Sequence, residues 1–153
     1  MRKVRRPLVL AALAGALVTA GCGGEREVVV RDEGGRVLVK TQLPESGRFA
    51  LEYRHSYYRV PAREEFRAGG SGFRMVGVGS SSEAVLDYYE LAGTKHLGPW
   101  ATLAPAHPRS FDRLPLIATE TGRRTLAVGG RRYPLYGATP RHLTIAVEEG
   151  TWP

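Results

Sequence analysis

The most regular segment of the chain reads Arg48-Phe49-Ala50-Leu51-Glu52-Tyr53-Arg54-His55. Phe49, Leu51 and Tyr53 alternate with smaller or charged residues, which is the period-two pattern of a strand with one buried face. His55 has the same parity as the three large side chains. The segment therefore predicts a half-buried β-strand whose apolar face ends in a histidine.

Short segments of the same kind follow this strand, separated by turn residues. We expect extended structure at 57–67, 73–78, 116–120, 123–128, 131–135 and 143–147. Pro61 places the first of these at a sheet edge or a bend, because proline cannot donate to a ladder. Thr121-Gly122 and Gly129-Gly130 are two-residue turns of the type that joins hairpins.

One segment departs from the β pattern. Residues 83–91 have apolar side chains at spacings of three and four after a run of serines, which predicts a short helix capped by serine and stopped at Gly93. We expect residues 94–110 to form a loop anchored by Trp100. We therefore predict that residues 48–150 form one mainly β domain, a small antiparallel sandwich or barrel with at most one short helix.

The segment before this domain, residues 22–47, is predicted to be a tether that contains a hairpin. Residues 28–30 and 37–39 are apolar and β-rich, and 32–35 supply turn residues between them. Glycines and charged residues flank both runs, so partial disorder is an alternative.

Residues 1–21 have the layout of an export signal. Arg2, Lys3, Arg5 and Arg6 precede an uncharged apolar run at 8–18. That run is too short for a membrane-spanning helix, which needs roughly 20 residues. The segment ends in Thr19-Ala20-Gly21-Cys22, which resembles the bacterial lipobox and predicts a diacylglycerol thioether on Cys22.

The cysteine count agrees with lipidation. Cys22 is the only cysteine in the chain, so it cannot form an internal disulfide. A secreted protein cleaved nearby, with a free thiol, is the alternative. With lipid on Cys22, we expect the protein to be anchored to the outer face of the plasma membrane or to the outer membrane.

Removal of the signal changes the size and the charge of the protein. The 153 residues fall by 21 to 132, enough for one domain, and the formal net charge falls by four from +7 to +3. The remaining cations alternate with acids, as at 63–67, and do not form a basic stretch with interleaved aromatics. We therefore expect no nucleic-acid partner.

The candidate polar site consists of His55, Ser56 and Glu64. Buried imidazole nitrogens need hydrogen-bond partners, and Glu64 on the next segment is a candidate partner of His55. Two interpretations follow: a small polar site for a ligand, metal or partner, and a hydrogen-bonded corner that fixes strand register. Aromatic residues at 53, 57, 58, 88 and 89, together with Trp100, either line a ligand groove or pack in the core.

Residues 55–66 resemble a motif of a bacterial family catalogued as domain of unknown function eighteen-fifty. The motif is a His-Ser pair at the end of a first strand, then a Pro and, three residues later, a Glu. The matching positions are His55, Ser56, Pro61, Glu64 and Phe66; the family usually has an acidic residue where this chain has Tyr58. Members of that family are commonly encoded beside tripartite ATP-independent periplasmic transporters, so the resemblance implies a small exported protein with an envelope role close to solute uptake.

Catalytic and metal patterns are weak. Adjacent His55 and Ser56 on an extended chain point to opposite faces, and the chain has no Gly-x-Ser-x-Gly elbow. The four histidines are scattered without ligand spacing, and the glycines at 69–79 lack a P-loop lysine. We therefore expect no catalytic residue, metal site or cofactor.

The sequence as a whole predicts a membrane-anchored, non-catalytic envelope lipoprotein, an accessory component linked to solute transport with transporter subunits as partners. A stand-alone protein that binds a small molecule or a metal is the alternative. A hydrolase with Ser56 as nucleophile is a remote one.

Overall fold

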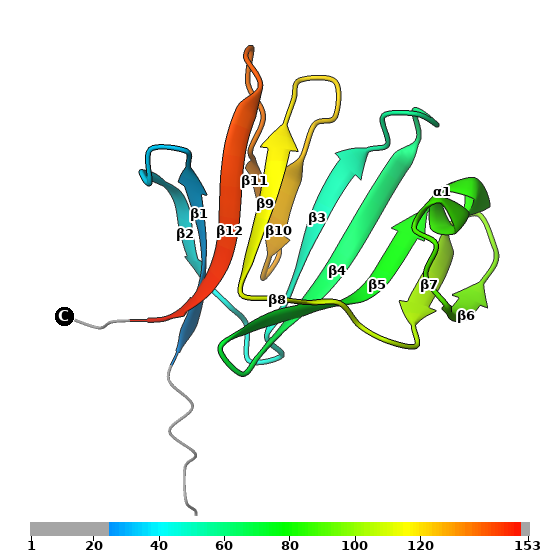
Figure 1. Cartoon of the computed structure of the whole chain (residues 1–153), viewed down its shortest axis with the longest axis horizontal. Helices are drawn as coiled ribbons and strands as arrows, with labels where there is room; N and C mark the ends of the chain where they lie inside the picture. The colour runs from blue at the N-terminus through cyan, green and yellow to red at the C-terminus, as the bar shows by residue number, and fades with distance from the viewer. Residues whose placement is uncertain (1–24, 151–153) are drawn as a thin grey trace, which may run out of the picture.

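The structure, a computed structural model, describes residues 25–150 and consists of two facing antiparallel sheets (Figure 1). One sheet has the order β2-β1-β12-β9; the other has the order β11-β10-β3-β4-β5-β7-β6, with β8 paired to β5. The strands are β1 (Arg26–Asp32), β2 (Val37–Gln42), β3 (Arg48–Arg54), β4 (Pro61–Gly69), β5 (Gly72–Ser80), β6 (Gly93–His96), β7 (Ala101–Pro105), β8 (Ser110–Phe111), β9 (Arg113–Ala118), β10 (Thr125–Val128), β11 (Arg131–Pro134) and β12 (Arg141–Glu149). The predicted mainly β sandwich is confirmed, and neither sheet closes into a barrel.

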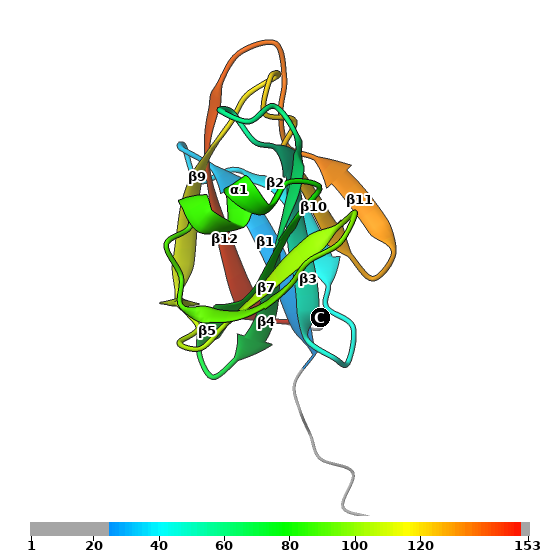
Figure 2. The ribbon, with the colours of Figure 1, turned by 90° about the vertical axis from the view of Figure 1, so that its right-hand side faces the viewer.

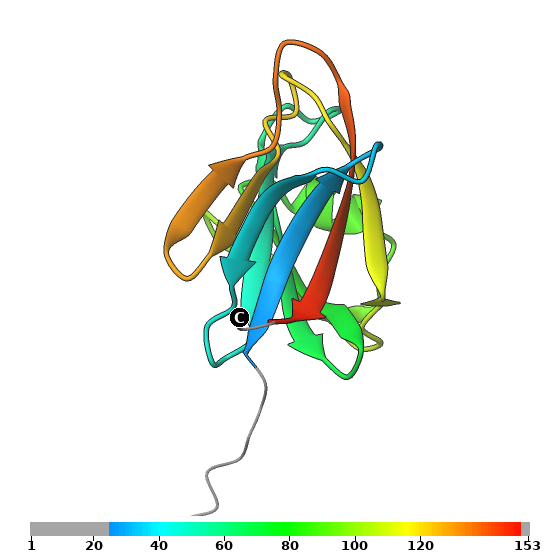
Figure 3. The same cartoon turned by 90° about the vertical axis from the view of Figure 1, so that its left-hand side faces the viewer.

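The predicted N-terminal hairpin is present as β1 and β2, but it is part of the domain. β1 pairs with β12 along its whole length, with Val28 opposite Val147 and Val30 opposite Ile145. Figure 3 shows this sheet with β1 between β2 and β12. Two apolar residues that face the core from β1 are fully buried. The domain therefore includes β1 and β2, and the boundary predicted at residue 48 was wrong.

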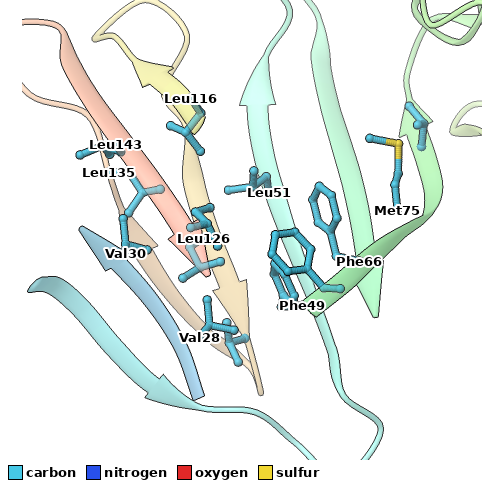
Figure 4. Close-up of a cluster of buried hydrophobic side chains, with 14 of the residues drawn as sticks. Val28, Val30, Phe49, Leu51, Phe66, Met75, Leu116, Leu126, Leu135 and Leu143 are labelled. Atoms are coloured by element: carbon cyan, nitrogen blue, oxygen red, sulfur yellow. The ribbon is translucent and has the colours of Figure 1, made fainter. Parts of the chain in front are cut away.

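The hydrophobic core lies between the two sheets (Figure 4). Val28 and Val30 from the first sheet and Leu51, Phe66 and Leu126 from the second have no exposed surface. An aromatic cluster continues the core along the second sheet, where the Phe49 and Phe66 rings stack with their centroids 5.2 Å apart. Burial of this kind stabilises a fold by about 25 cal/mol per Å² of apolar surface.

The register of β3 and β4 places the loop between them at 55–60. Arg54 pairs with Pro61 and Leu51 pairs with Glu64. The extended segment predicted from Tyr57 is therefore a turn up to residue 60, and Pro61 is the first residue of a central strand. Its missing N–H is tolerated because a strand's first residue is one of the few ladder positions that proline can occupy.

The two predicted glycine turns differ in their roles. Gly129 and Gly130 have φ values of +54° and +80° and join β10 to β11, as the two-residue hairpin requires. Thr121-Gly122 does not join a hairpin, because β9 pairs with β12 in one sheet whereas β10 pairs with β3 in the other. That turn connects the two sheets.

The single helix, α1 (Glu83–Tyr88), packs against the inner side of the second sheet near β5 and β7 (Figure 2). Val85 and Leu86 of this helix are buried. The helix is shorter than the predicted 83–91, and Ser82 occupies the N-cap position without a side-chain capping bond. It ends early because Glu90 adopts a left-handed conformation with a φ of +52°.

The loop predicted at 94–110 was wrong. This segment contains β6, β7 and β8, and Ala101 and Leu103 of β7 are buried. Gly98, Pro99 and Pro108 lie in the connections between these strands, and Pro105 is the last residue of β7, so none of them interrupts pairing.

No helix in residues 25–150 is long and apolar enough to cross a bilayer. The predicted signal at 1–21 and the predicted lipid site Cys22 lie outside the described residues.

Candidate functional site

Glu64 is a carboxylate on the inner face of the second sheet. It lies opposite Leu51 on one side and Val78 on the other, and both apolar side chains are buried. Inward-facing Phe66 follows two positions later and has no exposed surface. A half-buried carboxylate in this apolar row is unfavourable unless hydrogen bonds compensate it.

Two tyrosines provide that compensation. The Tyr89 hydroxyl donates to Glu64 Oε1, and a further hydrogen bond joins the Tyr53 and Tyr89 hydroxyls. Because Tyr89 has a single hydroxyl proton, Tyr53 must be the donor in the second bond. The three side chains form a directed chain from Tyr53 through Tyr89 to Glu64.

Burial and the Glu64 charge favour the protonated form of both tyrosines. Burial, and then the Glu64 carboxylate, raise the pKa of Tyr53 to about 12. The same two causes raise the pKa of Tyr89 above its ordinary value. Both hydroxyls therefore keep their protons at neutral pH.

His55 occupies the corner between β3 and β4. Its backbone N–H donates to Val60 O at 2.8 Å, and its Nδ1 accepts the Tyr58 N–H at 3.3 Å. The ring is 5% exposed, and the Tyr88 ring meets it edge-on at a centroid distance of 4.9 Å. Burial lowers the pKa of His55, so the neutral ring is favoured.

The three residues of the predicted polar site line one cleft. This inner cleft is lined by Tyr53, Arg54, His55, Ser56, Glu64, Tyr88, Tyr89, Glu90, Arg109, Ile117, Thr119, Gly122 and Arg124, with a volume of about 590 Å³. Ser56 lies exposed at its rim. The predicted His55–Glu64 hydrogen bond is absent from the described residues, because the register pairs Glu64 with Leu51 and leaves His55 beyond the end of β3.

The tyrosines and arginines that line the inner cleft were not assigned to the polar site by the sequence. Tyr53 shares the inward parity of its strand, and the grouping of Tyr88 and Tyr89 indicated an aromatic groove, but no pattern linked either to Glu64. Arg109 and Arg124 come from distant segments, and the Arg124 guanidinium carbon lies 5.1 Å from the centre of the Tyr53 ring. Only the pairing of β10 with β3 brings Arg124 to the cleft.

The described part of the chain groups no three His, Asp or Glu side chains in a way that could hold a metal ion. His96 belongs to the exposed edge strand β6, and His142 lies on β12 of the other sheet. The inner cleft offers two carboxylates, tyrosine hydroxyls and three arginines, a set that can bind a polar molecule by charge-assisted hydrogen bonds.

In comparisons with known proteins, no family model, no curated protein and no solved structure matches this chain.

Proposed function

We propose that this protein is a lipid-anchored, non-catalytic component of the cell envelope whose β sandwich binds a small polar ligand in the inner cleft. One observation carries the proposal: Glu64 lies in an otherwise apolar row, between Leu51 and Val78, at the wall of a cleft. An apolar residue would pack better there, and polar groups placed against apolar walls are what small-molecule sites use to orient a ligand.

The charges of the inner cleft define the ligand's chemistry. Arg109 and Arg124 attract an anionic group, and Glu64 accepts hydrogen bonds from a donor on the same molecule. The Tyr53 and Tyr89 hydroxyls hold the carboxylate in place before the ligand arrives. The ligand is therefore a small molecule with one anionic group and at least one donor, such as a hydroxy acid or an amino acid.

The arrangement of His55 and Ser56 supports a binding role over a hydrolytic one. The His55 ring accepts a backbone N–H through Nδ1, and within residues 25–150 no hydrogen bond joins it to Ser56. A serine nucleophile needs such a bond to its base.

The orientation of the domain fits an anchor at Cys22. β1 starts at one end of the sandwich, and the turns that bear His55 and Thr119 lie at the opposite end (Figure 1). A lipid attached a few residues before β1 would point the mouth of the inner cleft away from the membrane.

The motif at residues 55–66 supports a finer proposal, that the protein serves a tripartite ATP-independent transporter as an accessory component. Capture of transporter subunits with the tagged protein after crosslinking in intact cells is expected. Recovery of no transporter subunit would remove this part of the proposal and leave the ligand site unaffected.

A thermal-shift screen against organic acids, amino acids and divalent metals tests the binding role. We expect an acid or amino acid to raise the unfolding temperature. Glu64→Gln should reduce the shift, with an apparent affinity lower by a factor of ten or more, since a charged hydrogen bond contributes about 1.5–3 kcal/mol. Glu149→Gln, at the exposed end of β12, is the matched control. Shifts caused by metals alone and lost in His55→Ala would favour the metal-binding alternative.

A further inference from the structure

The outer face of the second sheet has an aromatic side chain seated on a glycine. Trp100 lies over Gly79, where an added Cβ would come within 2.5 Å of the indole Nε1. The indole is 43% exposed, although the close packing on the strand fixes it. Gly79 pairs with Arg63 of β4, so Trp100 is a platform on the polar side of the sheet.

Three arginines stand at the same end of the sheet. Arg54 ends β3, and its N–H donates to Gly122 O at 2.7 Å, which joins the turn before β4 to the turn before β10. Its Nε also donates to Arg59 O at 2.9 Å. Arg59 and Arg123 have φ values of +59° and +47°, strained for arginine, and strain of this kind is concentrated at functional sites.

The other charges of this face are already paired. Arg63 lies 3.1 Å from a Glu52 oxygen and 3.4 Å from a Glu65 oxygen, and Arg132 lies 2.5 Å from the second Glu52 oxygen. Within residues 25–150, no carboxylate lies within ion-pairing distance of Arg54, Arg59 or Arg123. These three rim arginines are therefore not ion-paired within the described residues and can bind an anion.

Trp100 and the rim arginines line one open groove. This outer groove has a volume of about 910 Å³ and is lined by Glu52, Tyr53, Arg54, Arg59, Pro61, Ala62, Arg63, Glu65, Trp100, Arg123, Thr125 and Arg132. Arg54 on β3 and Trp100 over β5 are separated by two strand spacings, or roughly 10 Å. An open groove of that width can hold more than one ring of a chain molecule.

We propose that the outer groove binds an acidic saccharide, with a sugar ring stacked on Trp100 and its carboxylate held by the rim arginines. A pyranose has an apolar CH face for the indole and hydroxyls for the polar floor at Glu52, Arg63 and Thr125. Carboxylates are the geometric match of the guanidinium fork. The site goes beyond the proposed function, since Trp100 and Arg63 lie on the opposite side of the sheet from Glu64, and the two hollows share only Tyr53 and Arg54 at the end of β3.

A nucleotide is the competing ligand, with its base on Trp100 and its phosphate on the arginines. The floor argues against it, because Glu52 and Arg63 are polar, and the apolar face of a base would cover them without forming hydrogen bonds to them. Tyr53 is the other aromatic residue of the groove lining, but its hydroxyl is bonded to Tyr89 and no ring contact joins it to Trp100 in the described residues.

The test is a calorimetric titration of the purified protein with an oligomer of galacturonic acid, a neutral galactose oligomer and adenosine monophosphate. We expect the acidic oligomer alone to bind, with an affinity that falls as salt rises. Trp100→Ala and the double variant Arg59→Asn with Arg123→Asn should each weaken binding by about tenfold or more. Asparagine tolerates the left-handed backbone, so the double variant removes charge without adding strain.

Arg74→Asn is the matched control, because Arg74 is an exposed arginine on β5 outside the outer groove. It should bind like the unchanged protein. Absence of binding by the acidic oligomer, equal binding of the nucleotide, or undiminished binding by the arginine double variant would overturn the proposal. If Trp100→Ala fails to fold, the arginine double variant still decides the outcome.

Discussion

Leu51 and Glu64 lie directly opposite each other in the β3–β4 ladder, and both side chains face the inner side of the sheet. Leu51 has no exposed surface, whereas Glu64 reaches the inner cleft and accepts a hydrogen bond from Tyr89. A carboxylate beside a fully buried leucine is a local violation of the rule that apolar faces stay apolar. Violations of that kind are concentrated at functional sites.

Tyr89→Phe should lower the free energy of unfolding by about 1–3 kcal/mol, because it leaves Glu64 without its donor and Tyr53 without its acceptor. Urea unfolding measures the change. Tyr57→Phe is the control, since Tyr57 is 78% exposed, and it should shift stability by less than about 0.5 kcal/mol. Equal stabilities of the two variants would show that the hydroxyl chain contributes nothing.

Stability should also decline at alkaline pH. Folding raises the pKa of Tyr53 from an ordinary 10.0 to about 12, so the folded state holds this proton more tightly than the unfolded state does. The resulting stabilisation is complete below pH 10 and is lost as the pH rises towards 12. Unfolding measured across this window should show the decline, and the double variant Tyr53→Phe with Tyr89→Phe should flatten it. If the double variant lost stability with rising pH as steeply as the unchanged protein, other groups would be responsible for the decline.

A chain that begins at Arg48 should fail to fold. It lacks β1, and with it the partner of β12 and two fully buried core valines. A chain that begins at Glu25 should keep a cooperative thermal transition in circular dichroism. A cooperative transition in the shorter chain would restore the boundary that the sequence predicted.

That boundary illustrates what the sequence could and could not predict. Alternation identified β3 and the turn residues identified the β10–β11 hairpin, because both signals are local. The pairing of β1 with β12 joins residues more than a hundred positions apart, and no local pattern encodes it. The glycines and charged residues that flank the valines of β1 resemble a tether until the partner strand is known.

The same limit applies to the candidate site. Parity placed His55 at the end of the apolar face, and Glu64 was named as its partner on the next segment, yet neither argument could fix the register of the two strands. Residues 57–60 were predicted to be extended, and pairing of the two segments as a hairpin was expected to bring His55 and Glu64 close together. The turn instead places Glu64 beside Leu51, where Tyr89, from the end of the only described helix, reaches it.

Gly79→Ala should displace Trp100, because the new Cβ would come within 2.5 Å of the indole Nε1. We expect a loss of about 1–3 kcal/mol in stability and a red shift of Trp100 fluorescence, measured in a Trp152→Phe background. Gly69→Ala is the control, since nothing lies within 4 Å of its added Cβ. Unchanged emission in Gly79→Ala would mean that Trp100 does not rest on the sheet.

The central claim is that Glu64 serves binding and not the fold. The triple variant Tyr53→Phe, Glu64→Leu and Tyr89→Phe replaces the whole hydrogen-bonded chain with apolar side chains, so no polar partner is left unpaired. Its free energy of unfolding, measured beside the unchanged protein, should be equal or higher, because sites kept for function are seldom optimal for stability. A loss of about 2 kcal/mol or more would contradict the claim and identify the chain as a structural corner.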